Sequence, residues 1–274
     1  MEHDTDYGQF NSLVRANKDT YILSYNGANG RGRIQTFTIP PDGSSITEVA
    51  NAAFADNGYS HFNSLVQVDH DTYLNAGYSY NTSGSAGYYG VLETFTIPTD
   101  GSTISSVANL KYTTANTGKY NKLLKLNANE YILAYMGSGN DGFIEMYTVS
   151  SDGATITKKW QNKFDGDNSW NDLVRVDKNT IALTYSGSGS DGYIQTFDIG
   201  TSDNAGPAIT ANSINYENSQ FTIMLDEAAY NTNEGSGDLE VSDFALSITG
   251  GAATLSSATP TSISKIGDSQ YVLG

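Results

Sequence analysis

Cysteine is absent from this chain of 274 residues, and basic residues are scarce. Without a thiol there can be no disulfide framework, no thiolate zinc site and no cysteine nucleophile. The 14 Lys and Arg residues stand against 30 Asp and Glu residues, which gives a net charge of −16. We therefore expect no nucleic acid and no anionic membrane surface as a partner, because both require a basic surface on the protein.

Long apolar runs are also missing. No stretch of about 18 consecutive apolar residues occurs, so we expect no membrane insertion. Residues Met1–Phe10 lack the charged and apolar regions of a secretory signal peptide. The three histidines, His3, His61 and His70, have no regularly spaced partner. The sequence therefore predicts neither a zinc site nor a serine protease-like triad.

Apolar and aromatic residues are nevertheless plentiful enough for a sizeable core. Hydrophobic residues make up 38% of the chain, which also contains 28 Gly, 19 Tyr and 10 Phe. A disordered chain does not have this composition, and the length suits one large domain or two ordinary ones.

Four similar segments follow one another through the first 200 residues. A leucine anchors each segment, with spacings of 52, 58 and 50 residues between Leu13, Leu65, Leu123 and Leu173. An aromatic residue follows 24, 30, 24 and 24 residues later, at Phe37, Phe95, Tyr147 and Phe197. The second segment therefore carries six additional residues. Self-similarity at a near-constant period indicates a repeat architecture.

Each repeat has the pattern of antiparallel β-strands. Short stretches such as SLVRA, TYILSY and RIQTFTI alternate or run apolar and are rich in Val, Ile, Tyr, Thr and Phe. Turn-forming pairs separate the third strand from the fourth at Asp42-Gly43, Asp100-Gly101 and Asp152-Gly153. Four strands in about 50 residues predict a β-propeller blade. A pair of Greek-key sandwiches, or another antiparallel repeat, remains the alternative.

The repeats resemble those of bacterial extracellular β-propellers of the kelch and FG-GAP type, over about residues 7–200. The kelch double glycine and the WD dipeptide are missing, so no single family's full signature is present. The resemblance implies an all-β fold of four propeller blades and an extracellular or cell-surface location. It implies nothing about activity.

A different kind of sequence begins at Pro207, after a polar linker at 201–206. The stretches FTIMLDEAAYN and LEVSDFALSITGG resemble the cadherin-like or Ig-like modules of large bacterial surface proteins. We therefore expect two domains, β-propeller repeats over residues 1–203 and a truncated Ig-like β-sandwich over residues 204–274. The second is shorter than the roughly 100 residues that such a sandwich normally has.

The repeats also suggest that the ring of blades is incomplete. The fourth repeat stops after its third strand, and the residues before the first repeat are too few for a full missing strand. A closed propeller commonly completes its last blade with a strand from the other terminus. The expectation is a part of a longer multidomain chain with further blades upstream. A closed four-bladed ring is the alternative.

One end of each repeat varies more than the other. The hairpins between second and third strands share this end with the connections from one repeat to the next, and the six additional residues lie there. Variable loops of repeat proteins often form the binding face. We therefore predict weak ligand-binding residues at Tyr78, Tyr80, Tyr88 and Tyr89, because tyrosine rings stack on sugars or anchor protein contacts. The alternative is that these rings only cover the edge of a blade.

An acidic loop precedes the fourth anchor leucine. Asp165, Asp167 and Asp172 loosely resemble the calcium loop of FG-GAP repeats, in which carboxylates alternate before a strand. Calcium prefers six to eight oxygen ligands, which a curling loop can supply. Asx turns that begin a strand explain the same residues without a metal. No other cofactor is expected.

These observations favour a non-catalytic extracellular module that binds a glycan or a protein. A structural spacer of a surface protein remains open. A propeller glycosidase or lyase is a third hypothesis, but it needs two carboxylates beside the scissile bond. The sialidase S-x-D-x-G-x-T-W motif is missing, and Asp172 is the only acid near the start of an inner strand.

Overall fold

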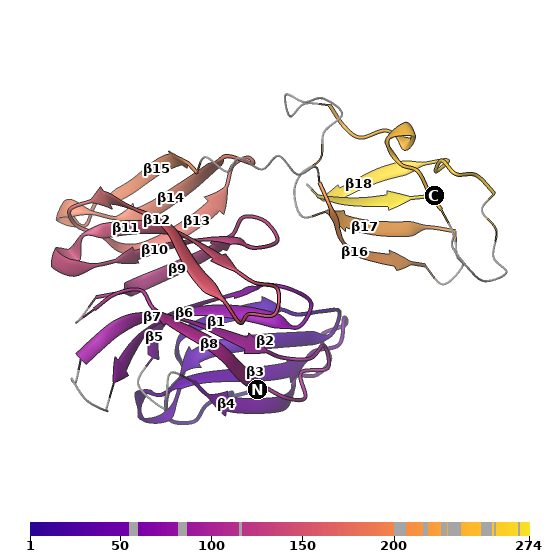
Figure 1. The fold of residues 1–274 in the computed structure, drawn as a ribbon. Helices are drawn as coiled ribbons and strands as arrows, with labels where there is room; N and C mark the ends of the chain where they lie inside the picture. Colours follow the sequence, from indigo (N-terminus) through magenta and orange to yellow (C-terminus); the bar gives the residue numbers. More distant parts are fainter. Residues whose placement is uncertain are drawn as a thin grey trace. The chain divides into compact units, whose positions relative to one another are not determined.

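The computed structural model describes two compact units, Met1–Ile199 and Gly200–Gly274 (Figure 1). The described residues are 1–54, 60–81, 87–114, 117–199, 207–215, 219–225, 229, 237–247, 254, 256–267 and 269–274. The predicted boundary at residue 203 lies outside them. In these parts of the chain, no helix is long and apolar enough to cross a membrane.

The first unit consists of antiparallel sheets in which strand order follows chain order. Sheet 1 contains β1 (Gln9–Arg15), β2 (Thr20–Asn26), β3 (Gly32–Thr38) and β4 (Thr47–Ala53), and sheet 2 contains β5 (Ser60–Gln67), β6 (Thr72–Asn81), β7 (Gly87–Thr96) and β8 (Ser105–Lys111). Sheet 3 contains β9 (Lys119–Lys125), β10 (Glu130–Met136), β11 (Gly142–Val149) and β12 (Ile156–Asp165), and sheet 4 contains β13 (Ser169–Arg175), β14 (Thr180–Ser186) and β15 (Gly192–Asp198). Each sheet is one sequence repeat, so the predicted strand order is confirmed.

The turns between these strands form where the sequence predicts them. Asn17 accepts hydrogen bonds from the backbone N–H groups of Asp19 and Thr20, which closes the turn between β1 and β2. Gly43, Gly101 and Gly153 have φ angles of +65°, +71° and +71° in the turns after the third strands. Only glycine adopts such angles without steric cost, which explains the three Asp-Gly pairs.

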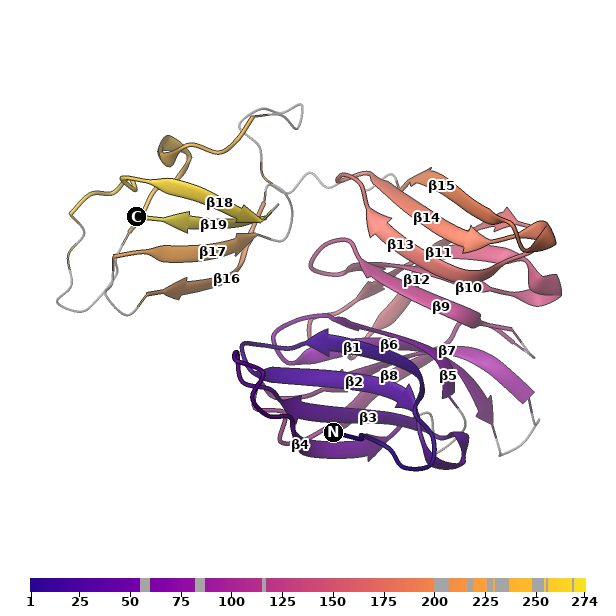
Figure 2. The ribbon, with the colours of Figure 1, turned by 180° about the vertical axis from the view of Figure 1, so that it is seen from behind.

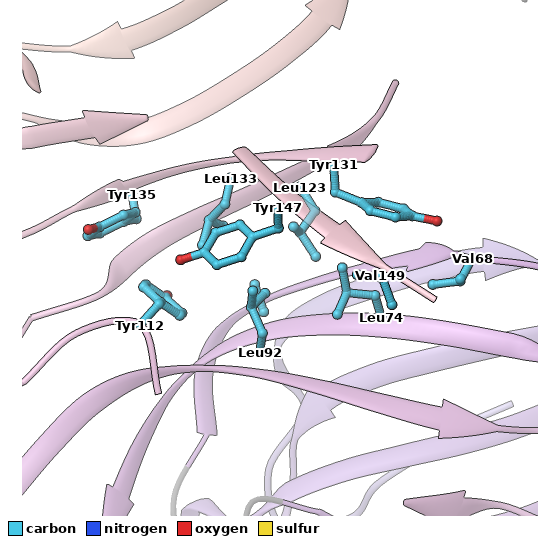
Figure 3. Close-up of a cluster of buried hydrophobic side chains, with 11 residues drawn as sticks. Val68, Leu74, Leu92, Tyr112, Leu123, Tyr131, Leu133, Tyr135, Tyr147 and Val149 are labelled. Atoms are coloured by element: carbon cyan, nitrogen blue, oxygen red, sulfur yellow. The ribbon is translucent and has the colours of Figure 1, made fainter. Parts of the chain in front are cut away.

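The sheets of the first unit pack face to face in chain order (Figures 1 and 2). The first strands β1, β5, β9 and β13 are neighbours, one from each sheet. Between sheets 2 and 3, Leu74 and Leu92 lie against Leu123, Leu133 and Tyr147 (Figure 3). Similar buried clusters join sheet 1 to sheet 2 and sheet 3 to sheet 4. Apolar burial between consecutive sheets therefore holds the unit together.

The second unit contains one described antiparallel sheet with the order β16-β17-β19-β18. Its core includes Ile223, Leu225 and Tyr271. An Ig-like sandwich has two packed sheets, and the residues described in this unit form one, so the Ig-like module stays a prediction. The strands are β16 (Ile209–Ile214), β17 (Phe221–Leu225), β18 (Ile263–Gly267) and β19 (Gln270–Leu273).

Two equivalent glycines provide a matched test of the packing in the first unit. Gly142 and Gly192 each begin the third strand of their sheet. A Cβ atom at Gly142 would lie 2.5 Å from the Phe164 ring and 3.0 Å from Asn168. At Gly192, no atom of the described residues lies within 4 Å of such a Cβ.

Gly142→Ala is therefore expected to lower the free energy of unfolding by about 1–3 kcal/mol, because it overpacks the core. Gly192→Ala should change it by less than about 0.5 kcal/mol. Urea unfolding followed by tryptophan fluorescence measures both values. Equal effects would show that Phe164 moves away without cost.

Candidate aromatic binding site

An aromatic residue stands three positions before the anchor leucine in every repeat. These residues are Phe10, Phe62, Tyr120 and Trp170, here called the aromatic row. Their ring centroids are 4.5 Å apart from Phe10 to Phe62, 4.5 Å from Phe62 to Tyr120 and 4.8 Å from Tyr120 to Trp170. One ring from each of the four sheets thus joins a continuous row along the neighbouring first strands.

The backbone of the row is strained in the same way four times. The φ angles of Phe10, Phe62, Tyr120 and Trp170 are +55°, +55°, +54° and +56°. Such angles in bulky side chains cost roughly 1–3 kcal/mol each and occur mainly at functional sites. The same unfavourable conformation in every repeat indicates that the direction of these rings matters.

A β-bulge produces this conformation. In each first strand, the aromatic residue and the asparagine after it oppose a single residue of the second strand. A bulge of this kind redirects a side chain out of the regular alternation. In sheets 1 and 3, Asn11 and Asn121 donate to the carbonyl oxygens of Gly8 and Gly118, at 2.9 and 3.0 Å. These bonds stabilise the bulge.

The aromatic row lies at the end of the sheets that the sequence predicts to be the variable face. Gln9, beside Phe10, pairs with Asn26 at the end of β2, where the hairpin to β3 begins. Ser169, beside Trp170, likewise pairs with Ser186 at the end of β14. The row therefore shares one edge of the unit with the hairpins.

Three of the four predicted tyrosines pack beside this row, with Tyr80 and Tyr88 half-buried and Tyr78 only 5% exposed. Tyr78 and Tyr88 stack with ring centroids 4.7 Å apart and planes 9° apart, and Tyr80 lies 4.7 Å from Tyr88. His61 connects them to the row, because its ring centroid lies 5.2 Å from that of Phe10, on which it stacks, and 6.3 Å from that of Tyr88. The additional residues of the second repeat thus enlarge one continuous surface. The tip of their hairpin, residues 82–86, lies outside the described residues.

Tyr89 is on the opposite side of the hairpin. Its ring faces Lys111, whose Nζ atom is 4.1 Å from the ring centroid. This cation–π contact joins β7 to β8 at the outer part of sheet 2. Tyr89 therefore lies apart from the aromatic surface, to which Tyr80 and Tyr88 contribute, while the buried Tyr78 supports Tyr88 from below by stacking.

The surface combines neutral groups with different exposure. Trp170 is 67% exposed, whereas Phe10, Phe62 and Tyr120 are half-buried. Burial raises the pKa of Tyr78 to about 12, with a smaller contribution from Tyr88. Burial also lowers the pKa of His61 below its usual value of 6.5. At neutral pH the surface therefore presents uncharged rings.

The predicted calcium ligands have protein partners instead. Asp165 accepts a hydrogen bond of 2.6 Å from the Tyr185 hydroxyl, and this bond is the main reason that its pKa is lowered. Asp172 forms an ion pair of 2.7 Å with Lys122. The backbone N–H of Asp167 donates to Asp165 at 3.2 Å, as in an Asx turn.

These contacts do not bring Asp165, Asp167 and Asp172 together as a group of metal ligands. Over the parts of the chain that the structure describes, no three His, Asp or Glu side chains are placed to hold a metal ion. The calcium site therefore gains no support from the geometry. The alternative, turns closed by Asp side chains, accounts for Asp165 and Asp167.

The aromatic row itself is not among the residues predicted from the sequence. Its signal is nevertheless visible, since the repeats begin FNSL, FNSL, YNKL and WNDL. In a strand with regular alternation, the aromatic residue would point to the opposite face from the anchor leucine three positions later. The bulge changes this direction. An aromatic residue followed by asparagine, three and two positions before each anchor leucine, could have identified the site.

Comparison with solved structures gives partial matches at low identity, with TM-scores below 0.5. A NanB sialidase variant of Streptococcus pneumoniae matches with a TM-score of 0.49 and 14% identity, over 66% of this chain and 29% of that chain. The periplasmic gluconolactonase PpgL of Pseudomonas aeruginosa matches with a TM-score of 0.48 and 11% identity, over 81% of this chain and 66% of that chain. The β-propeller domain of Nup133 from Vanderwaltozyma polyspora matches with a TM-score of 0.44 and 12% identity, over 68% of this chain and 55% of that chain. The present chain spans less than a third of the sialidase.

No protein-family model matches the chain, and no curated protein matches it. The kelch and FG-GAP resemblance therefore stays a prediction. What the structure establishes is an all-β chain of several antiparallel sheets with propeller-type neighbours.

The lowered pKa of His61 has a consequence for stability. Because the pKa is lower in the folded chain than the unfolded value of 6.5, protonation favours unfolding. The contribution of neutral His61 to the stability of the fold is present above pH 6.5 and is lost as the pH falls from 6.5 through the folded-state pKa.

NMR titration of the histidine ring protons, assigned with His61→Gln, should give a midpoint below 6.5. The His61→Gln variant should also lose less stability than the parent chain in this pH range. A midpoint at or above 6.5 would contradict the burial of this ring.

Proposed function

We propose that the first unit is a β-propeller-type array of four blades and that its aromatic surface binds neutral glycans without catalysis. The surface consists of the aromatic row together with His61, Tyr80 and Tyr88, and the buried Tyr78 supports it by stacking on Tyr88. The proposal is supported chiefly by one observation, the contact of four equivalent rings held at positive φ. A fold alone would not support it, because one fold carries many functions.

Aromatic rings suit a sugar because they are large, rigid and apolar and lose little conformational freedom on binding. The row is continuous across four sheets, which favours an extended oligosaccharide over a single sugar. Trp170 offers the most exposed ring, at one end of the row. Tyr88 widens the surface near Phe62, because it stacks on Tyr78, whose buried ring contacts Phe62.

Charge selects among glycans. The chain carries a net charge of −16, so sialylated or sulfated sugars are repelled at long range. The rings of the surface are uncharged, and the Nζ atom of Lys119 lies 5.5 Å from the centre of the Tyr78 ring. Neutral hexose-containing chains are therefore the proposed ligands.

The wider biological setting follows the sequence resemblance. We infer a binding or adhesion module of a secreted or surface-attached protein, with the second unit as an Ig-like module. Glycoside cleavage needs a pair of carboxylates, and the described residues that define the aromatic surface are rings. A non-catalytic role fits these groups better.

A printed array of neutral, sialylated and sulfated glycans, probed with the fluorescently labelled 274-residue chain, tests the proposal. Binding is expected to neutral oligosaccharides. Trp170→Ala should weaken it by about tenfold, or roughly 1–2 kcal/mol, as for an exposed aromatic residue that contacts the ligand. Isothermal titration calorimetry with the best oligosaccharide measures this change.

Tyr193→Ala serves as the matched control. Tyr193 is 39% exposed and stacks on Tyr185 at 5.3 Å, outside the aromatic surface, so its removal should leave glycan affinity unchanged. An array without any bound glycan would refute the proposed function and favour a spacer. Equal losses in both variants would show that the glycan binds elsewhere.

A further inference from the structure

The outer edge of β15 has no partner strand among the described residues. Sheets 1, 2 and 3 each add a fourth strand beside the third, whereas the described order of sheet 4 ends at β15. The backbone N–H of Ile199 donates to the carbonyl oxygen of Asn179 at 2.8 Å. Because backbone bonds alternate along an antiparallel pair, Ile194 and Thr196 direct their N–H and C=O groups away from β14. Such an edge is a template for a further strand.

The side chains of β15 reflect this open edge. One position of the third strands is at most 6% exposed in sheets 1 to 3, at Gln35, Glu93 and Glu145. Its equivalent in β15, Gln195, is half-buried, although sheet 3 covers this face of sheet 4. The additional exposure is therefore on the side where the other sheets have a fourth strand.

Unlike the outer strands of the other sheets, β15 carries no charge along most of its length. The outer strands β4, β8 and β12 include Glu48, Lys111 and Lys158. Charged side chains on an edge strand discourage the addition of another strand. In β15 the only charged residue is Asp198, at its end. The edge of β15 is thus open to pairing, whereas charges oppose pairing at the other three edges.

In sheets 1 and 2, a threonine of the third strand binds the backbone of the fourth strand. The N–H of Ala50 donates to the hydroxyl of Thr36 at 3.0 Å. The N–H of Ala108 donates to the hydroxyl of Thr94 at 3.1 Å. At the same position β15 has an exposed threonine, Thr196, whereas sheet 3 has a methionine. A strand added to β15 can therefore place an alanine N–H against a threonine hydroxyl, as in sheets 1 and 2.

The fourth strand also matches the residue that precedes an equivalent glycine of the third strand. In sheet 2 the Nζ atom of Lys111 lies 4.1 Å from the centre of the Tyr89 ring. In sheet 3 Lys163 forms an ion pair of 2.7 Å with Asp141. In sheet 1 the residue before the glycine is Arg31, and the fourth strand has alanine instead of lysine. The lysine is thus present where its partner is aromatic or acidic and absent where its partner is basic.

In sheet 4 the corresponding residue is Asp191, which is exposed. It has the charge of Asp141, so it fits a lysine in an added strand. An amide stands two residues before the lysines of sheets 2 and 3, at Asn109 and Gln161. Gln195 occupies the position that lies opposite this amide in those sheets. The edge of β15 therefore favours a strand with the pattern Ala-Asn-x-Lys.

We propose that β15 binds an extended, lysine-containing segment of a partner protein as the fourth strand of sheet 4. The segment runs antiparallel to β15 and has the pattern Ala-Asn-x-Lys. Its alanine N–H donates to the Thr196 hydroxyl, its amide residue opposes Gln195, and its lysine pairs with Asp191. Recognition by addition of a strand combines such side-chain contacts with main-chain hydrogen bonds.

Charge identifies the kind of partner. The chain carries a net charge of −16, so a basic segment is attracted at long range. A second copy of the chain would be repelled, and its own Ala-Asn-x-Lys stretch, residues 108–111, already pairs with β7. The occupant is therefore a basic segment of another protein.

A fluorescein-labelled peptide with the sequence of Ile104–Tyr112 contains the pattern and serves as the probe. Fluorescence anisotropy with the full 274-residue chain should show saturable binding with a dissociation constant below about 100 μM. Thr196→Val should weaken this binding by about threefold or more, because the alanine N–H loses its acceptor. Circular dichroism should show an unchanged fold, since Thr196 is exposed. A dissociation constant of the parent chain above this limit would overturn the proposal.

A charge swap locates the lysine of the peptide. Asp191→Lys should weaken binding of the parent peptide by about tenfold or more and should restore binding of a peptide with glutamate in place of its lysine. Glu48→Lys, an equal change of charge at an exposed residue of β4, is the control and should leave both affinities almost unchanged. Equal effects of the two variants would show that the peptide responds only to net charge, and the proposal would then be wrong.

Two N-methylated peptides test strand addition itself. N-methylation of the peptide alanine removes the N–H that meets Thr196, so binding should be lost. N-methylation of the peptide asparagine is the control, because by the same alternation its N–H points away from β15, and binding should persist. Equal effects of the two methyl groups, or binding insensitive to both Thr196→Val and Asp191→Lys, would overturn the proposal.

Discussion

Burial of apolar side chains between consecutive sheets is the interaction on which the rest of the first unit depends. An isolated antiparallel sheet of three or four short strands leaves at least one apolar face in water. Here each interior sheet covers its neighbours on both sides, and residues such as Ile144 and Leu133 become inaccessible to solvent. The same packing aligns the four first strands and so determines where the aromatic rings meet. The site is therefore a consequence of the core.

The stability of the packed sheets allows the four bulges to keep an unfavourable backbone conformation. Four aromatic residues hold an unfavourable backbone conformation, which only a well-packed surrounding can maintain. Buried polar groups reinforce the same framework. Glu145, for example, is completely buried, but it accepts hydrogen bonds from the hydroxyls of Tyr135 and Tyr147 and pairs with Lys158 at 2.7 Å. A buried carboxylate with these partners is satisfied, so this glutamate contributes to structure within sheet 3.

Much of this organisation could be predicted from the sequence. Strand order and turns follow from alternation with period two and from Asp-Gly pairs, which are local properties. The variable face could be located because the additional residues near Tyr80 and Tyr88 lie at one end of the repeat. The aromatic row could not, because a bulge interrupts the alternation that assigns side chains to faces. Spacing likewise suggested that Asp165 and Asp172 act together, but they bind Tyr185 and Lys122, residues that are distant in sequence.

One ring per repeat makes the length of the aromatic row, the proposed binding surface, depend on the number of repeats in the chain. Each duplicated unit would add one aromatic step and each deletion would remove one, while the individual steps can change identity independently, as Phe10, Phe62, Tyr120 and Trp170 already do. Affinity for a ligand could then change with the number of repeats, and preference among ligands could change by exchange of Phe, Tyr or Trp in a single repeat. Such a surface can follow a changing ligand without redesign of the fold.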